Sequence, residues 1–210
     1  MNEFAYHEIK NAIITGQYRS GEWLVESEIA KRLNLSRTPV REALLYLEKE
    51  GFLTNVPHKG MMVRKFKYEE LKDIYQVRSV LEGLCAFLAT ENAGASLKEE
   101  LLRNIELAKK SLAEEDVRRL AKLNSDFHAK ITEASGNNLL KQLLDNLRAC
   151  SSIMRISIWT IPNRPKKALE EHEQIMQAIV GGKKMLAAKR AMDHIINSWK
   201  NAQRVLEEEE

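Results

Sequence analysis

Three histidines in the C-terminal part of the chain have the spacing of inward-facing helical residues. His128 follows Asn124 by four residues, so the two share a helical face with Ala121 and Ile131. The faces predicted for His172 and His194 are small or apolar, with Ala168, Ile175 and Ile179 beside the first and Ala187, Ala191 and Ser198 beside the second. Three imidazoles are therefore expected to point into one helical bundle.

Burying three imidazoles without partners costs free energy, and a divalent metal would satisfy all three at once. Imidazole nitrogen is a good ligand for zinc, nickel, copper and cobalt. The alternative is three unrelated, half-buried histidines. Helix geometry by itself leaves both open; for a bound metal, zinc or nickel is the first candidate and manganese the third.

Arg78 is a second inward-facing polar residue in this part of the chain. It belongs to a helical stripe that is otherwise apolar: Leu71, Ile74, Leu81, Cys85 and Leu88. A buried arginine needs an anionic partner. That partner is either a small carboxylate effector or Glu82, four residues later on nearly the same face.

The N-terminal part carries a different kind of chemistry. Arg37 and Arg41 lie four residues apart beside the apolar helical face formed by Val40, Ala43, Leu44 and Leu47. Arginine can bind guanine O6 and N7 with two hydrogen bonds, or bind phosphate. Ser36 and Thr38 at the start of the same helix can add phosphate contacts.

Short elements surround these arginines in a winged helix-turn-helix pattern. We expect a helix over 28–33 that is capped by Ser27, and a second helix that is capped by Ser36 and ended by Gly51. Asn34 is expected in the left-handed turn between them. Two β-prone runs, 52–56 and 61–65, flank a hairpin loop that presents His58, Lys59 and Gly60. The alternative is a small helical subdomain in which Arg37 pairs with Glu42 or Glu48.

Composition supports a mainly α-helical chain. Of 210 residues, 44% are hydrophobic and 30% charged, with only nine Gly and four Pro. Helical periodicity predicts an antiparallel all-helical bundle over 69–92, 97–114, 116–135, 139–159, 167–180 and 183–207. We thus expect two domains, a winged helix-turn-helix domain with a small β-hairpin over 1–66 and a helical effector- and metal-binding domain over 69–207.

Charge and hydropathy restrict the class of protein. The net charge of +3 is too small to argue nucleic-acid binding by itself, so that argument depends on where the charges lie. No run of 18 apolar residues and no secretory leader pattern is present. We expect a cytoplasmic protein without a membrane partner.

The N-terminal residues resemble GntR-type transcription regulators. The similarity covers residues 4–66 and is carried by the runs Gly16–Leu24, Glu28–Ala30, Leu35–Leu44 and Leu47–Leu53, with Gly60 and Val63 in register. The resemblance implies that Arg37 and Arg41 contact double-stranded operator DNA and that His58-Lys59-Gly60 is the wing tip. It also implies a homodimer on a two-fold symmetric operator.

Residues 70–200 resemble the FCD ligand-sensing domain of the FadR group of these regulators. The pattern is Arg78–Glu82, Phe127-His128, Gly136-Asn137, Glu171-His172 and Met192–His194, in order. Metal-binding members use an acidic residue four positions before the first histidine, and here that position is Asn124. With three neutral imidazoles and one amide, a divalent ion keeps its full charge, which favours a small carboxylate at its open positions.

Two other function classes compete with a regulator. A metallohydrolase could use the three histidines, but His172-Glu173-Gln174-Ile175-Met176 has Met176 where a metalloprotease motif needs its second histidine. A helical interaction module without a small ligand is the other alternative. We predict a non-enzymatic, metabolite-responsive regulator that binds DNA as a dimer.

Overall fold

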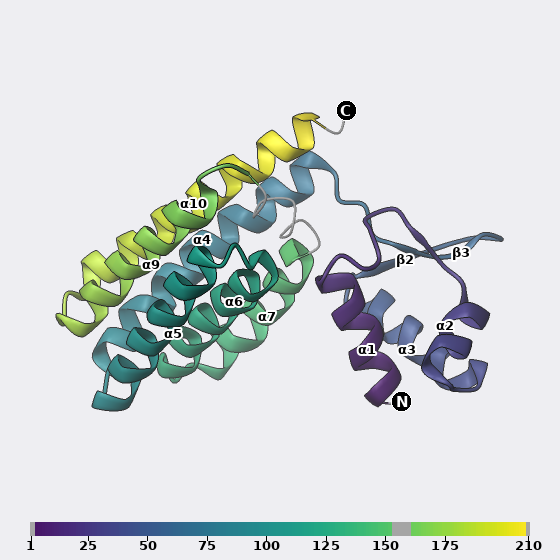
Figure 1. Cartoon of the computed structure of the whole chain (residues 1–210), viewed down its shortest axis with the longest axis horizontal. Helices are drawn as coiled ribbons and strands as arrows, with labels where there is room; N and C mark the ends of the chain where they lie inside the picture. The colour runs from purple at the N-terminus through teal and green to yellow at the C-terminus, as the bar shows by residue number, and fades with distance from the viewer. Residues whose placement is uncertain (1–2, 153–160, 209–210) are drawn as a thin grey trace. The chain divides into compact units, whose positions relative to one another are not determined.

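The computed structural model describes residues 3–152 and 161–208. The chain divides into two units, one formed chiefly by Met1–Lys67 and the other by Tyr68–Arg148 with Arg155–Glu210. Helices dominate both units, and the β-structure is a small antiparallel sheet in the first (Figure 1). The predicted fold class, mainly α with an N-terminal winged helix-turn-helix and a helical bundle, is confirmed.

Three helices build the first unit: α1 (Glu3–Ile14), α2 (Glu26–Leu33) and α3 (Arg37–Lys49). Their apolar faces enclose a core whose largest fully buried members are Ile9, Ile13, Ile29, Leu44, Leu47 and Phe52. Val40, Ala43, Leu44 and Leu47 of α3 are buried in this core, and the exposed side of the helix carries Arg37, Thr38 and Arg41 together with Leu45 and Tyr46.

The turn between α2 and α3 follows the expectation at Asn34. This residue is left-handed, with φ of 54°, and caps the C-terminus of α2. The start of α2 differs, because the helix begins at Glu26 after Val25, and Ser27 lies inside its first turn instead of capping it. Glu26 and Glu28 both lie in that first turn, where the helix dipole stabilises negative charge.

The sheet contains one strand more than the predicted hairpin. β2 (Leu53–Val56) and β3 (Gly60–Val63) pair antiparallel as expected, with Val56 opposite Gly60. A two-residue strand, β1 (Trp23–Leu24), pairs with the other edge of β3, so the order is β1-β3-β2. Two residues are too few to produce a period-2 signal in the sequence.

The second unit is a bundle of long helices. Its described members are α4 (Tyr68–Glu91), α5 (Ala95–Ala113), α6 (Val117–Ala134), α7 (Asn138–Ser152), α9 (Arg164–Val180) and α10 (Lys184–Glu208). In this bundle α10 packs along both α4 and α9, and α6 packs against α4 and α5 (Figure 1). Phe127, Leu101, Leu144, Ile175 and Ile179 are among its fully buried side chains.

One predicted helix boundary in the bundle differs from the structure, and another lies outside the described residues. α9 begins at Arg164, three residues before the predicted start, because Pro165 is accommodated in the first turn of a helix. The predicted end of the preceding helix at Trp159 lies outside the described residues. None of the helices in the described ranges combines the length and the apolar character needed to cross a membrane.

Candidate functional site

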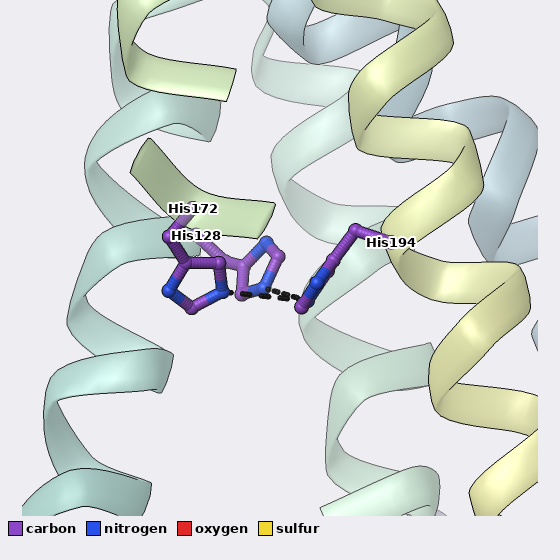
Figure 2. A group of neighbouring side chains, drawn as sticks. All are labelled: His128, His172 and His194. Carbon is purple, nitrogen blue, oxygen red and sulfur yellow. Dashed lines mark hydrogen bonds between the residues drawn. The ribbon is translucent and has the colours of Figure 1, made fainter. Parts of the chain in front are cut away.

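The three predicted histidines meet inside the bundle, each supplied by a different helix. His128 comes from α6, His172 from α9 and His194 from α10, and their exposed fractions are 4%, 3% and 2%. Nε2 of His194 lies 3.2 Å from Nε2 of His128 and 3.4 Å from Nε2 of His172. Figure 2 shows the three rings turned toward one point, with those two short contacts dashed.

This spacing suits a metal ion. Two nitrogens bound to a tetrahedral ion at about 2.0–2.1 Å lie about 3.3 Å apart. The two measured Nε2 separations fall on either side of that value. His194 therefore has the spacing of a co-ligand with each of the other two histidines, and ring nitrogens of all three lie within 4.8 Å of one another, so the triad could hold one divalent cation.

Two carboxylates hold the outer edges of the rings. Oε2 of Glu82 on α4 lies 3.2 Å from Nδ1 of His128, and Oε2 of Glu171 on α9 lies 2.7 Å from Nδ1 of His194. An ionised carboxylate can only accept, so each Nδ1 carries the proton and each Nε2 presents its lone pair. Two lone pairs facing each other across 3.2 Å repel, and a cation between them removes that repulsion.

Burial keeps the imidazoles neutral. Burial removes the water that would stabilise a charged ring, and this desolvation is the main reason that the pKa of His128 falls from 6.5 to about 4. The pKa values of His172 and His194 are lowered for the same main reason. Neutral imidazole is the form that binds metals. At neutral pH the site therefore presents three metal-ligating lone pairs in place of three charges.

Glu82 is the buried centre of an ionic network that the sequence only partly indicated. It is 2% exposed and accepts two hydrogen bonds from Arg148 on α7, Nε to Oε1 at 2.9 Å and Nη2 to Oε2 at 2.7 Å. Arg148 also donates to the Thr132 hydroxyl at 2.7 Å and to the His128 carbonyl at 3.2 Å. Burial alone would raise the pKa of Glu82, but His128 and Arg148 reverse the effect and hold it well below its ordinary value.

Arg78 lies inward, as its helical stripe predicted, with 7% exposure. Its Nε is 3.5 Å from Oε1 of Glu82, so it takes part in the i, i+4 ion pair that was the alternative to an effector contact. The position of Glu82 four residues after an inward arginine was the available signal for this network. Nothing in the sequence indicated that Arg148 would join it.

Glu171 has a similar set of partners on the other side of the triad. It accepts from Arg164 Nη1 at 2.9 Å and from Asn197 Nδ2 at 2.8 Å, besides His194. Burial opposes its ionisation, and the hydrogen bond with His194 and the charge of Arg164 outweigh that cost, so its pKa falls to about 2. In the sequence, Glu171 was evident only as part of the FCD-like pattern.

Asn124 lies one turn before His128 on α6 and lines a small cavity together with His172. The cavity has a volume of about 10 Å³, close to the space of a single water. Its other walls are mostly apolar: Ala108, Leu120, Leu123, Pro165 and Leu169, with Asn104 as a further amide. Asn124 and His172 therefore line the same cavity, which has room for about one water molecule.

A larger, polar groove of about 240 Å³ lies between α9 and α10 and reaches His194. Its charged lining is mixed, with the cations Arg190 and Lys200 and the anions Glu171 and Asp193. The remaining lining residues are Gln174, Ile196 and Asn197. The groove is lined by His194 and the small cavity by His172, so each space includes a different histidine of the triad.

The predicted DNA-contacting residues of the first unit all lie on its surface. Ser36 precedes α3 in an extended conformation and its side chain makes no capping hydrogen bond, while Arg37 and Thr38 open the helix. Arg41 is exposed and forms an ion pair with Glu26 of α2, at 2.9 Å from Nη2 to Oε2. Glu26 is a partner that sequence analysis did not identify.

The predicted wing tip lies at the β2–β3 turn, with His58 and Lys59 in the loop and Gly60 as the first residue of β3. His58 and Gly60 have positive φ values of 63° and 94°, and the Lys59 amide donates to the Val56 carbonyl at 3.0 Å. Glycine adopts such a φ without strain, so Gly60 suits the tight return into β3. His58, Lys59 and Gly60 are all exposed.

Comparison with known families and proteins follows this division of the chain. Residues 1–63 match the model of "Bacterial regulatory proteins, gntR family", and residues 73–197 match that of the FCD domain. The Nta operon transcriptional regulator of Aminobacter aminovorans is 31% identical over 87% of this chain and 85% of its own length. A probable D-xylose utilization operon transcriptional repressor of Paenarthrobacter nicotinovorans is also 31% identical, over 87% and 80%.

A solved structure shares the whole fold. McbR/YncC of E. coli superposes with a TM-score of 0.85, covering 98% of this chain and 97% of its own, at 21% identity. At this identity the likeness concerns the fold alone.

Proposed function

The chain belongs to the GntR family of bacterial transcription regulators and carries an FCD domain, and from this premise we propose that it is a metal-dependent sensor of a small carboxylate. Binding DNA and regulating transcription are properties of its family, and its relatives are regulators, not enzymes. The proposal adds a homodimer, a metal held by the histidine triad and an anionic effector. It places the protein in the cytoplasm, where bacterial DNA lies.

The observation that carries the metal proposal is the convergence of three buried Nε2 atoms, two of them fixed by carboxylates on the opposite edge of the ring. His128, His172 and His194 would hold the ion, and Asn124 would be a weaker or water-mediated fourth contact. Zinc and nickel suit three imidazoles best, with manganese third. A bound ion supplies a positive charge with open coordination positions.

Charge around the triad supports an anionic effector. Arg78, Arg148 and Arg164 face two glutamates, so the network has one net positive charge before a metal binds. Neutral imidazoles and the Asn124 amide add nothing to offset a divalent ion. A carboxylate that binds the ion would neutralise part of this charge, and we retain Arg78 as a residue that attracts it.

On the DNA side, we propose that Ser36, Arg37, Thr38 and Arg41 contact the major groove and its phosphates. His58, Lys59 and Gly60 would follow an adjacent groove. All of these residues are exposed, the first four at or near the start of α3 and the other three at the β2–β3 turn, and this exposure supports the proposed contacts. A two-fold operator pairs with a two-fold protein, so we propose a homodimer. Light scattering should give twice the mass of the 24.1 kDa chain, and a monomer at micromolar concentration would contradict it.

Elemental analysis of the purified protein tests the metal. We expect a near-stoichiometric transition metal in the wild type, its loss in His172→Gln, and its retention in His7→Gln, a matched change at an exposed histidine of α1. Calorimetry with zinc, nickel and manganese on chelator-treated protein then ranks the ions. Wild-type protein that neither contains nor binds any of them would overturn the proposal.

Calorimetry with acetate and citrate, with and without metal, tests the effector class. We expect heat of binding in the metal-loaded protein and much weaker binding after chelation, since the ion supplies most of the attraction. Equal binding in both forms would place the carboxylate away from the metal and contradict this part of the proposal.

A further inference from the structure

The guanidinium of Arg41 is exposed, yet one of its edges is fully engaged by Glu26. Nε lies 3.0 Å from Oε1 and 3.2 Å from Oε2 of Glu26, and Nη2 lies 2.9 Å from Oε2. The Arg41 side chain is 66% exposed, so burial does not hold it in place. The two parallel hydrogen bonds from Nε and Nη2 to the Glu26 carboxylate fix the orientation of the Arg41 guanidinium.

A guanidinium has two edges that can form such forks. The side edge presents Nε and one hydrogen of Nη2, and this is the edge that Glu26 binds. The end edge presents Nη1 and the second hydrogen of Nη2, and the Glu26 contact leaves both of these available. Two parallel N–H groups on one edge are what the O6 and N7 atoms of guanine accept in the major groove.

We propose that Glu26 is a positioning residue for DNA specificity: it holds Arg41 by the side edge so that the end edge reads a guanine. The inference rests on the proposed contact of Arg41 with DNA. Glu26 is the first residue of α2, and Arg41 lies in the second turn of α3. The fork therefore joins the two helices of the helix-turn-helix and sets the arginine relative to both.

The negative charge of Glu26 adds a second effect. A carboxylate beside the guanidinium is repelled by DNA phosphates, so it disfavours poses in which Arg41 leaves the groove for the backbone. Without that charge, a flexible arginine can bind any nearby phosphate, and such contacts carry no sequence information. Glu26 thus favours base reading over non-specific attachment.

The test uses the full-length protein and a random-sequence duplex library. Selection with the wild type defines the preferred sequence, and titrations then measure affinity for that duplex, for the same duplex with the preferred guanine pair replaced, and for a scrambled duplex. The variants are Glu26→Gln, Arg41→Ala and the double substitution. Glu28→Gln is the matched control, because it removes the same charge from the same first turn of α2.

If Glu26 positions Arg41, Glu26→Gln lowers discrimination at that base pair by about tenfold, within the range that a bidentate arginine contributes. Affinity for the scrambled duplex rises, and the salt dependence of binding steepens by about one phosphate contact. Glu28→Gln leaves the base preference unchanged. In the Arg41→Ala background, Glu26→Gln causes no further loss of discrimination.

Two results would overturn the inference. Unchanged base preference in Glu26→Gln, with lost preference in Arg41→Ala, removes Glu26 from specificity while leaving Arg41 at the DNA. Equal strengthening on all duplexes would make the pair an inhibitory contact that opens on binding. Unchanged preference in Arg41→Ala would instead reject the proposed role of Arg41 itself. Circular dichroism and thermal unfolding verify that each variant is folded.

Discussion

The two units of this protein position their functional side chains in opposite ways. In the bundle, the histidines and their carboxylate partners are buried, and each Nδ1 edge of His128 and His194 is fixed by a glutamate that arginines hold in turn. In the winged unit, the arginines lie at the surface, and Arg41 depends on one exposed ion pair. Buried groups couple function to folding, whereas exposed groups can be changed with little effect on stability.

The largest expected effect comes from breaking the buried network. Glu82→Gln leaves Arg148 and Arg78 without their shared anion, and loss of one partner of a buried ion pair costs about 3–5 kcal/mol. Urea denaturation of the metal-free variant measures the change. Glu99→Gln, at an exposed position of α5, is the matched control and should stay within about 0.5 kcal/mol of wild type. Similar values for the two variants would refute the contrast between buried and exposed charged groups.

A somewhat smaller effect is expected from pH on the metal-free protein. The pKa of His128 is 6.5 in the unfolded chain and about 4 in the fold, so between these values the unfolded state binds more protons. Stability should therefore fall as pH decreases from about 6.5 to 4, by about 3 kcal/mol from this residue.

This pH window separates histidines from carboxylates. The pKa of Glu171 is lowered from 4.5 to about 2, so its contribution to stability is lost only as pH falls from 4.5 toward 2. Urea midpoints measured from about pH 7 to pH 5 would therefore show the histidine part with little contribution from Glu171. A flat profile over this range would mean that the triad is not held neutral by burial.

Asn124→Asp changes the charge of the proposed metal site in the bundle. The substitution would add a negative ligand beside the proposed ion, which three neutral imidazoles would leave fully charged. We expect metal affinity to rise by about 10–100-fold, the range over which the surroundings of a metal alter its binding. Carboxylate affinity should fall in the same variant, because the net positive charge falls. Calorimetry with zinc and with citrate decides both, and tighter citrate binding would contradict the electrostatic cause.

The smallest effect on stability is expected in the winged unit. Ser36→Ala should change the free energy of unfolding by less than about 0.5 kcal/mol, because the Ser36 hydroxyl makes no capping bond. Asp116→Ala should cost about 1 kcal/mol, since the Asp116 side chain accepts from the Arg119 amide at 3.0 Å. Ser36→Ala should nevertheless weaken DNA binding a few-fold by removing one phosphate contact. A stability loss equal to that of Asp116→Ala would contradict the assignment.

Local sequence patterns were sufficient for the helical class and for the faces of the helices. Periodicity placed His128, His172 and His194 on inward faces, and a single helix wheel is enough for that conclusion. Asn34 was expected in the left-handed turn because its side chain tolerates that conformation. These features depend on residues within one or two turns of each other, which is the range that a sequence window contains.

Contacts between distant segments were decided by tertiary structure. Glu82 and Arg148 are 66 residues apart, and Glu26 and Arg41 belong to different helices, so no local pattern joins them. The inward position of Arg78 was evident from the sequence, but its ion pair with Glu82 was established only by the structure. Helical periodicity in the sequence was enough to identify which side chains face inward. Which of them contact one another depends on the packing of α4, α6, α7, α9 and α10. Ionic and metal-ligand contacts form only at short distances, and the arrangement of whole helices sets those distances.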